Sequence, residues 1–215
     1  MKWSVLPVAL LVVGTLAMAQ SQTPEGQGSG SSASSTTSTK PDPTIGQRKE
    51  NQQDRIANGV QSGQLTAGET SNLESKEAAI NGETKADRAA DGGKLTTADK
   101  TQINKQQNQL SKQIYQDKPN ANTAHYGNNA VGQRRENQQD RIANGIRSGQ
   151  LTAGETTKLE NQQRAINKQV SADRTANGGK LTAGEKTQVN REQNQASRNI
   201  YSKKHNAATQ PEGKG

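Results

Sequence analysis

The architecture of this chain follows from residues 47–70, QRKENQQDRIANGVQSGQLTAGET, which return at residues 133–156 as QRRENQQDRIANGIRSGQLTAGET. The two stretches lie 86 positions apart and are identical at 21 of 24 positions. The segments that follow them, 71–122 and 157–208, are identical at only 27 of 52 positions. Self-similarity at a fixed period indicates a repeat architecture, so we expect two tandem copies of one structural unit, repeat one and repeat two.

A helix-start signature, Gly-x-Leu-Thr-x-x-acid, occurs four times in the chain. In such a capping box the threonine hydroxyl accepts a hydrogen bond from the backbone amide three residues on, and the acid accepts one from the threonine amide. The acid is also favoured by the positive end of the helix dipole. We therefore expect helices to start at four threonine–acid pairs: Thr66/Glu69, Thr96/Asp99, Thr152/Glu155 and Thr182/Glu185.

The spacing of apolar residues predicts three helices in each repeat. The first carries Ile45, Ile56 and Val60 at spacings of 11 and 4, which keeps them in one narrow stripe on a helix. We expect this helix to end at Asn58-Gly59, where glycine can adopt the left-handed conformation. The second is expected over residues 66–90 and 152–176. Stripes of the second and third helices are expected at Leu73, Ile80, Ile103, Leu110 and Ile114, and at Leu159, Ile166, Val170, Val189, Ala196 and Ile200.

These signals predict an all-α fold class, with two tandem copies of a three-helix unit after a disordered linker. Each copy forms either a small three-helix bundle or a pair of extended helical hairpins, and length alone does not decide between them. The expected segments are a signal peptide (1–19), a disordered Ser/Thr/Gly/Pro linker (20–43), helical repeat one (44–118), a linker (119–129), helical repeat two (130–206) and a disordered tail (207–215).

The first residues have the features of an export signal. Lys2 is followed by an apolar run at 5–16, too short to span a bilayer, and by the small-residue cleavage site Ala17-Met18-Ala19. We therefore expect a secreted protein, in the periplasm or outside the cell. No second apolar run follows, so no transmembrane segment is expected in the mature chain.

The mature chain is poor in apolar residues. It has no Cys and no Phe, and Trp3, Met1 and Met18 all lie in the leader. Disulfides cannot support a small core in this protein. Stability is therefore expected from helix capping and a thin apolar seam, with self-association as an open alternative.

Charge is uneven along the chain, whose formal net charge is +8. Residues 44–130 hold 11 Lys/Arg and 10 Asp/Glu, a net +1, whereas residues 131–215 hold 15 and 8, a net +7. On an exported protein, such a basic half suggests an anionic envelope polymer or lipid headgroups as the partner, and no nucleic acid. A surface that is cationic only for solubility is the alternative.

Residues 50–55, ENQQDR, are polar and identical to residues 136–141. Core packing does not obviously explain this identity, so the retained residues predict either a contact surface for a protein partner or hydrogen bonds between helices or copies. A recent duplication would also explain it. The candidate partner-binding residues are Glu50, Gln53, Asp54, Arg55, Glu136, Gln139, Asp140 and Arg141.

The turn before each capping box has a partial likeness to a calcium-binding EF-hand loop. With Gly63 at the loop's glycine position, Glu69 falls where a bidentate acid belongs, but the other ligand positions lack carboxylates. A degenerate EF-hand-like cation site at Glu69 and Glu155 is therefore the alternative function. His125 and His205 have neither ligand spacing nor a nucleophile context, so we expect no cofactor and a non-enzymatic protein.

Two tyrosines, Tyr115 and Tyr201, close the third helix of each repeat as Ile-Tyr followed by lysines. We expect them to seal the end of a small core, with the hydroxyl in water. Contact with a membrane surface or stacking on a sugar is the alternative.

The pattern Arg-Ile-x-x-Gly-x-x-Ser-Gly-x-Leu-Thr-x-x-Glu occurs at 55–69 and 141–155, and the chain closes its second repeat with Ile-Tyr-x-x-Lys-His-Asn at 200–206. Together these motifs resemble a group of exported bacterial helical-repeat proteins that has no assigned activity. The resemblance covers residues 47–208 and implies export and a repeat architecture, without catalytic residues. Repeat one departs from it at Lys118-Pro119-Asn120, which lacks the histidine.

Overall fold

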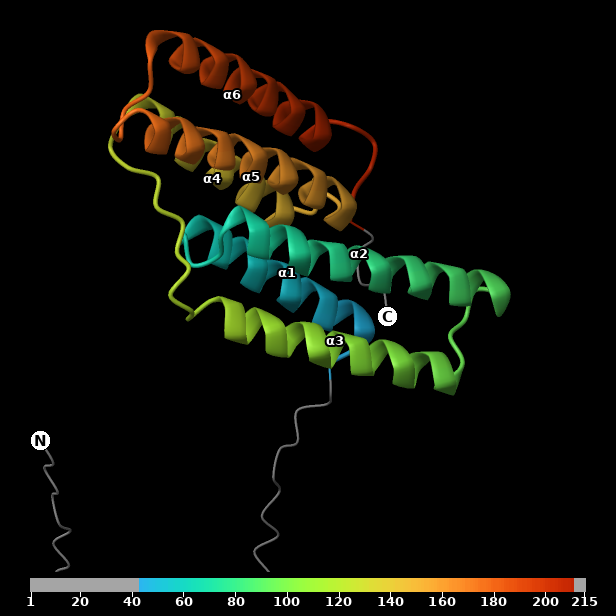
Figure 1. Cartoon of the computed structure of the whole chain (residues 1–215). Coiled ribbons are helices and arrows are strands. Elements are labelled where there is room, and N and C mark those ends of the chain that lie inside the picture. Colours follow the sequence, from blue (N-terminus) through green and yellow to red (C-terminus); the bar gives the residue numbers. More distant parts are fainter. Residues whose placement is uncertain (1–42, 211–215) are drawn as a thin grey trace, which may run out of the picture. The chain divides into compact units, whose positions relative to one another are not determined.

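Six α-helices make up the computed structural model, which describes residues 43–210, and no strand occurs among those residues (Figure 1). The predicted all-α class is therefore confirmed, and the order of elements is compatible with two tandem three-helix units. The predicted signal peptide, nearly all of the 20–43 linker and the end of the tail lie outside the described residues. The helices are α1 (Ile45–Gln61), α2 (Ala67–Ala90), α3 (Thr97–Asp117), α4 (Ala130–Arg147), α5 (Ala153–Ala176) and α6 (Ala183–Lys204).

Capping boxes start five of these helices, four of them at the predicted threonine–acid pairs and the fifth, ahead of α1, at Thr44 and Gln47. Ahead of α2, Glu69 N donates to Thr66 Oγ1 at 3.3 Å, and Thr66 N donates to Glu69 Oε2 at 2.9 Å. The same reciprocal pair stands at Thr96, Thr152 and Thr182. Each box satisfies amides that the first helical turn leaves without a partner, and this fixes where the helix begins.

The predicted end of the first helix at Gly59 is wrong, because α1 continues to Gln61 and the left-handed residue is Gly63, with φ 70°. Gly59 is needed for packing. A Cβ atom on Gly59 would lie 2.6 Å from Leu65 Cδ1, and Leu65 is fully buried. The returning chain therefore packs directly on the helix backbone at Gly59.

The apolar stripes predicted for the three helices form the core. In repeat one, Ile56, Leu73, Ile103 and Ile114 are fully buried. Ile45 is only partly buried and packs on the edge of the same cluster. None of the helices within residues 43–210 is long and apolar enough to cross a membrane.

The two repeats pack on each other, which the sequence leaves open. Helix α2 lies along α5 and α1 lies along α4, and one hydrophobic cluster includes residues of both repeats (Figure 1). Across the α2–α5 interface, Ser71 Oγ donates to Asn161 Oδ1 at 2.9 Å, and Ser75 lies opposite Thr157. Ser71 is equivalent to Thr157 and Ser75 to Asn161, so each repeat contributes the same two positions to the interface. This reciprocity is that of the self-complementary interface of a two-fold dimer.

Candidate functional site

The identical polar stretch in α1 and α4 is turned partly into the protein. Gln53 and Gln139 are each only 5% exposed. Gln53 Nε2 donates to Glu74 Oε2 at 3.2 Å, and Gln139 Nε2 donates to Glu160 Oε2 at 2.9 Å. Two of the eight candidate residues therefore bind other helices of their own repeat.

Two further side chains of this stretch anchor the first helix to the third. Arg55 Nη2 donates to the carbonyl of Ser111 at 3.0 Å, and Arg141 makes the equivalent bond to Ser197. The neighbouring Gln52, which sequence reasoning did not select, donates from Nε2 to the Gln107 carbonyl at 2.6 Å and to Ser111 Oγ at 2.7 Å. The hydrogen bonds between helices that the sequence offered as one explanation are therefore present.

Four acids of the candidate set remain toward solvent. Glu50, Asp54 and Glu136 are exposed, and Asp140 is half-buried. Among the eight candidate residues the two glutamines are therefore buried, the two arginines and Asp140 are half-buried, and the other three acids are exposed.

Sequence reasoning missed a set of buried carboxylates on α2 and α5. Glu74, Glu77 and Glu160 are fully buried. Burial raises the pKa of Glu74 and Glu160 to about 8 and that of Glu77 to about 7. Glu74 and Glu160 follow Leu73 and Leu159 in the stripe, and their retention in both copies was the available signal.

Repeat one balances its extra buried acid with a cation. The charge of Lys49 lowers the pKa of Glu77 against the larger effect of burial. At the equivalent positions repeat two has Arg135 and the neutral Gln163. Gln163 donates to Gln138 Oε1 at 3.1 Å, and Arg135 lies over the Tyr126 ring, 5.4 Å from its centroid.

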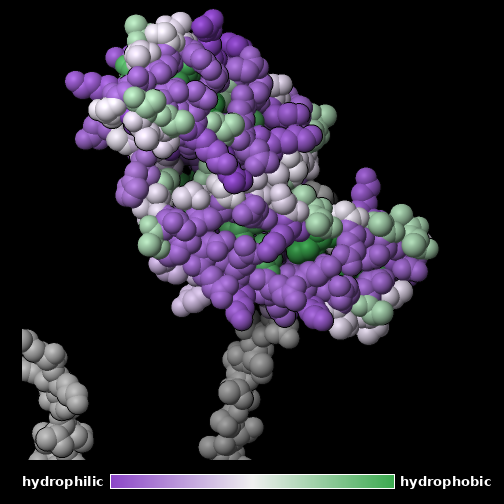
Figure 2. Space-filling model, in the orientation of Figure 1, coloured by the Kyte–Doolittle hydropathy of each residue, from purple (hydrophilic) through white to green (hydrophobic). Residues whose placement is uncertain are grey.

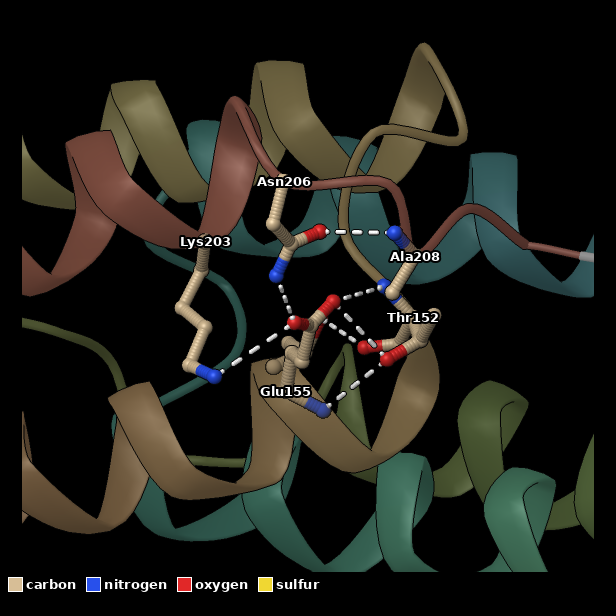
Figure 3. A network of polar contacts seen from close by, with 6 residues as sticks. Thr152, Glu155, Lys203, Asn206 and Ala208 are labelled. Atoms are coloured by element: carbon tan, nitrogen blue, oxygen red, sulfur yellow. Dashed lines mark hydrogen bonds and ion pairs between the residues drawn. The ribbon is translucent and has the colours of Figure 1, made fainter.

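The acids proposed for a cation site are occupied by other contacts (Figure 3). Glu155 Oε2 accepts from the amide and hydroxyl of Thr152, while Glu155 Oε1 accepts from Asn206 Nδ2 at 2.6 Å and lies 3.6 Å from Lys203 Nζ. Burial would raise the pKa of Glu155, but these contacts together outweigh it and lower the pKa. Glu155 therefore caps α5 and also holds the segment that follows α6.

Repeat one repeats this tether at Glu69. Asn120 Nδ2 donates to Glu69 Oε1 at 2.7 Å, and Ala124 N donates to the Gly63 carbonyl at 2.8 Å. Among residues 43–210, no group of three or more His, Cys, Asp or Glu could hold a metal ion. The geometry at Glu69 is that of a capped turn joined to the end of its own repeat.

The prediction that the two tyrosines seal the core is wrong. Tyr115 is 73% exposed and Tyr201 is 60% exposed. The preceding isoleucines, Ile114 and Ile200, occupy the buried stripe position, so the next residue on the helix faces solvent. Tyr201 stacks on His205 with ring centroids 4.1 Å apart.

Basic residues of repeat two are exposed on α5, on α6 and in the turn between them. None of the following side chains forms an ion pair with another residue of the described chain, so their charges face solvent. These exposed residues are Lys158, Arg164, Lys168, Lys180, Lys186, Arg191 and Arg198. Three of them stand where repeat one has uncharged residues: Lys158 for Asn72, Arg164 for Ala78 and Lys168 for Gly82.

The chain matches no protein-family model, no curated protein and no solved structure in comparisons with each. No fold or activity is therefore inherited from a relative.

Proposed function

We propose that this chain is an exported, non-catalytic binding protein of the bacterial cell envelope. Its cationic surface on α5 and α6, formed by Lys158, Arg164, Lys168, Lys186 and Arg191, attaches to an anionic envelope polymer. The observation that carries the proposal is the charge difference between the repeats, +7 for residues 131–215 against +1 for residues 44–130. Clustered charge of one sign attracts and holds a polyanion.

The end of α6 adds an aromatic contact to this surface. Tyr201 is exposed and stacks on His205, and Lys204 precedes that histidine in the chain. An exposed aromatic ring suits stacking on a sugar ring of such a polymer. This supports a charged glycan, or a polymer attached to one, over a protein.

The remaining polar groups support a scaffold over an enzyme. Glu74 and Glu160 are sealed inside the protein, and Glu69 and Glu155 are held in capping boxes. These acids stabilise the fold and none lies free at a cleft with a histidine. Cation binding through Glu69 and Glu155 has little support, because their oxygens already accept hydrogen bonds from the protein.

A second candidate surface is formed by the exposed acids of the first helices. Glu50, Asp54 and Glu136 are exposed, and they are identical in the two copies. The hydrogen bond from Gln53 to Glu74 accounts for the presence of glutamine at that position in both copies. Within residues 43–210 no such hydrogen bond accounts for Asp54 or Glu136, whereas Glu50 does interact with another residue. A protein partner with a basic surface would fit them.

Co-sedimentation of the full mature chain with purified cell-wall polymer at low salt tests the main proposal. One variant carries Lys158→Glu, Lys168→Glu and Lys186→Glu on repeat two. The matched control carries Lys94→Glu, Lys105→Glu and Lys112→Glu on repeat one, with the same change in net charge. We expect the first variant to lose roughly tenfold or more in retention and the control much less, with binding weakened by salt. Equal losses in both variants would contradict the proposal.

A further inference from the structure

We propose that repeat one contains a second, separate binding site, a groove for a single-chain anionic amphiphile such as a long-chain fatty acid. The groove has a volume of about 930 Å³ and lies between α1, α2 and α3, beside the start of α5. A cavity of this size falls within the range of small-molecule sites. The site is distinct from the cationic surface of repeat two and does not depend on it.

The floor of the groove is apolar. Ile80 is 6% exposed, and Ile45 and Leu95 are partly buried against the same core. Ala78 continues this lining along α2. Figure 2 shows strongly hydrophobic side chains in a hollow of repeat one, bordered by hydrophilic ones. Such a floor would remove a hydrocarbon chain from water.

The rim of the groove carries only one sign of charge. Lys85, Arg88 and Lys100 line it, and no Asp or Glu lines the groove; the buried Lys49 lies deeper, near Glu77. Lys85, Arg88 and Lys100 are exposed and form no ion pair with other residues between 43 and 210. A carboxylate at the end of an apolar chain would meet these cations while the chain lies on the floor. This division of apolar floor and basic rim matches an anionic amphiphile and does not match a sugar polymer.

Repeat two provides an internal comparison, since its equivalent hollow is only about 330 Å³. Val170 stands there in place of Thr84 and is buried in a cluster with Ile166 and Leu181. Lys168 stands in place of Gly82. In repeat two this position is therefore apolar and buried in the core, and the hollow beside it is smaller.

Gly82 of α2 lines the groove of repeat one. It lies in the middle of α2, where glycine lowers helix stability relative to alanine. A Cβ on Gly82 would meet nothing within 4 Å, so neither packing nor a turn requires glycine there. It lines the groove, and a larger side chain at this position would enter it.

The site is tested by displacement of a fluorescent fatty-acid probe from the full mature chain. Both ends of the described chain, Pro43 and Gln210, line the groove, so the terminal segments must be present. Unlabelled carboxylates of increasing length are compared with the alcohols of equal length, all below their critical micelle concentrations. We expect binding to strengthen by up to roughly fourfold for each added methylene that reaches the floor. We expect the alcohols to bind at least tenfold more weakly.

Two variants locate the site. Gly82→Trp is expected to weaken probe binding at least tenfold, whereas Gly184→Trp, at an open position on α6, should leave it unchanged. If Gly82→Trp fails to fold by circular dichroism, Thr84→Leu replaces it, because repeat two already holds an apolar residue at that position. No displacement by the full chain, or equal binding by both tryptophan variants, would overturn the site.

The triple Glu variant of repeat two separates this inference from the proposed function. Lys158→Glu, Lys168→Glu and Lys186→Glu should abolish polymer retention and leave probe binding within twofold of the unmodified chain. A parallel loss of probe binding would show non-specific attraction of anions and would reject the groove.

Discussion

Gln139 Nε2 donates a 2.9 Å hydrogen bond to Glu160 Oε2 in the interior of repeat two, and the same contact joins Gln53 to Glu74 in repeat one. Gln139 Oε1 and Glu160 Oε1 both lack a hydrogen-bond partner among the described residues. Burial raises the pKa of Glu160 to about 8, so this carboxyl is mostly protonated at neutral pH. A protonated glutamate adds a donor to a pair that otherwise has too few.

These carboxyls predict that the protein loses stability as the pH rises. In the folded state Glu74 and Glu160 keep their protons up to about pH 8, whereas the ordinary value is 4.5. Between these values the folded state binds more protons, so the free energy of unfolding falls with rising pH. The stabilising contribution of the two protonated carboxyls is complete below pH 4.5 and is lost by about pH 8. We expect a melting temperature lower by on the order of 10 °C at pH 8.5 than at pH 5, by circular dichroism.

Glu160→Gln is the control for this pH dependence. The amide keeps the shape, supplies the missing donor and does not titrate, whereas Glu74 and Glu77 still titrate, so about a third of the fall between pH 5 and pH 8.5 should disappear. Glu155 acts in the opposite direction, because its lowered pKa gives stability that is lost as the pH falls below the ordinary value of 4.5. A melting temperature that is constant from pH 5 to pH 8.5 would contradict the protonated state of Glu74 and Glu160.

The anchoring glutamine of α1 is expected to matter more than its polarity suggests. Gln52→Ala removes two hydrogen bonds to α3 and leaves a cavity in a fully enclosed place. We expect a loss of about 2–4 kcal/mol in the free energy of unfolding in urea. The control is Gln109→Ala, at an exposed position of α3, the helix to which Gln52 binds. It should change the free energy of unfolding by less than about 0.5 kcal/mol. Similar effects of both changes would show that the inward glutamine is not an anchor.

Two glycine-to-alanine changes should have opposite signs. Gly59→Ala places a methyl group against the buried Leu65 side chain and should destabilise the protein by about 1–3 kcal/mol. Gly82→Ala enters open space in the middle of a helix and should stabilise it by about 0.5–1 kcal/mol. Urea unfolding of both variants checks the prediction. Stabilisation by Gly59→Ala would mean that Leu65 can move aside.

The tether at Glu155 predicts local protection from exchange. Asn206→Ala removes a 2.6 Å hydrogen bond from the side chain that also caps α5. We expect about 1–2 kcal/mol of global destabilisation, and faster hydrogen exchange at the backbone amide of Gln210, which donates to the Gly149 carbonyl. Asn190→Ala, at an exposed position of α6, is the control. Unchanged hydrogen exchange at Gln210 would show that the bond between Asn206 and Glu155 does not hold the segment after α6 in place.

Local signals in the sequence were sufficient for the helix starts and the apolar stripes. The capping boxes involve residues three apart, and Leu73 and Ile80 repeat with the helix period, so neither needs information from distant residues. Gly59 was misassigned because glycine serves both as a helix end and as a point of close approach. Only the position of Leu65 in space distinguishes the two.

The distant contacts could not be predicted. Glu74 and Glu160 are glutamates, a residue type that is rarely buried without a partner. The partner of each is a glutamine 21 residues earlier in the chain, which donates a hydrogen bond to the carboxyl group. The candidate residues of the first helices were identified by their identity in the two copies, but the sequence could not separate the inward Gln53 from the outward Asp54. The groove of repeat one also could not be predicted, because residues far apart in the sequence, on α1, α2, α3 and at the start of α5, line it together.

The α2–α5 interface uses the same positions from both repeats, so a chain with one repeat would present a face that fits a second molecule of itself. Joining the two units covalently replaces encounter in solution by a fixed high effective concentration. In a fused chain the two repeats can also differ in sequence, because a substitution in one repeat does not occur in the other. The two halves of the present chain do differ, with a net charge of +1 for residues 44–130 and +7 for residues 131–215.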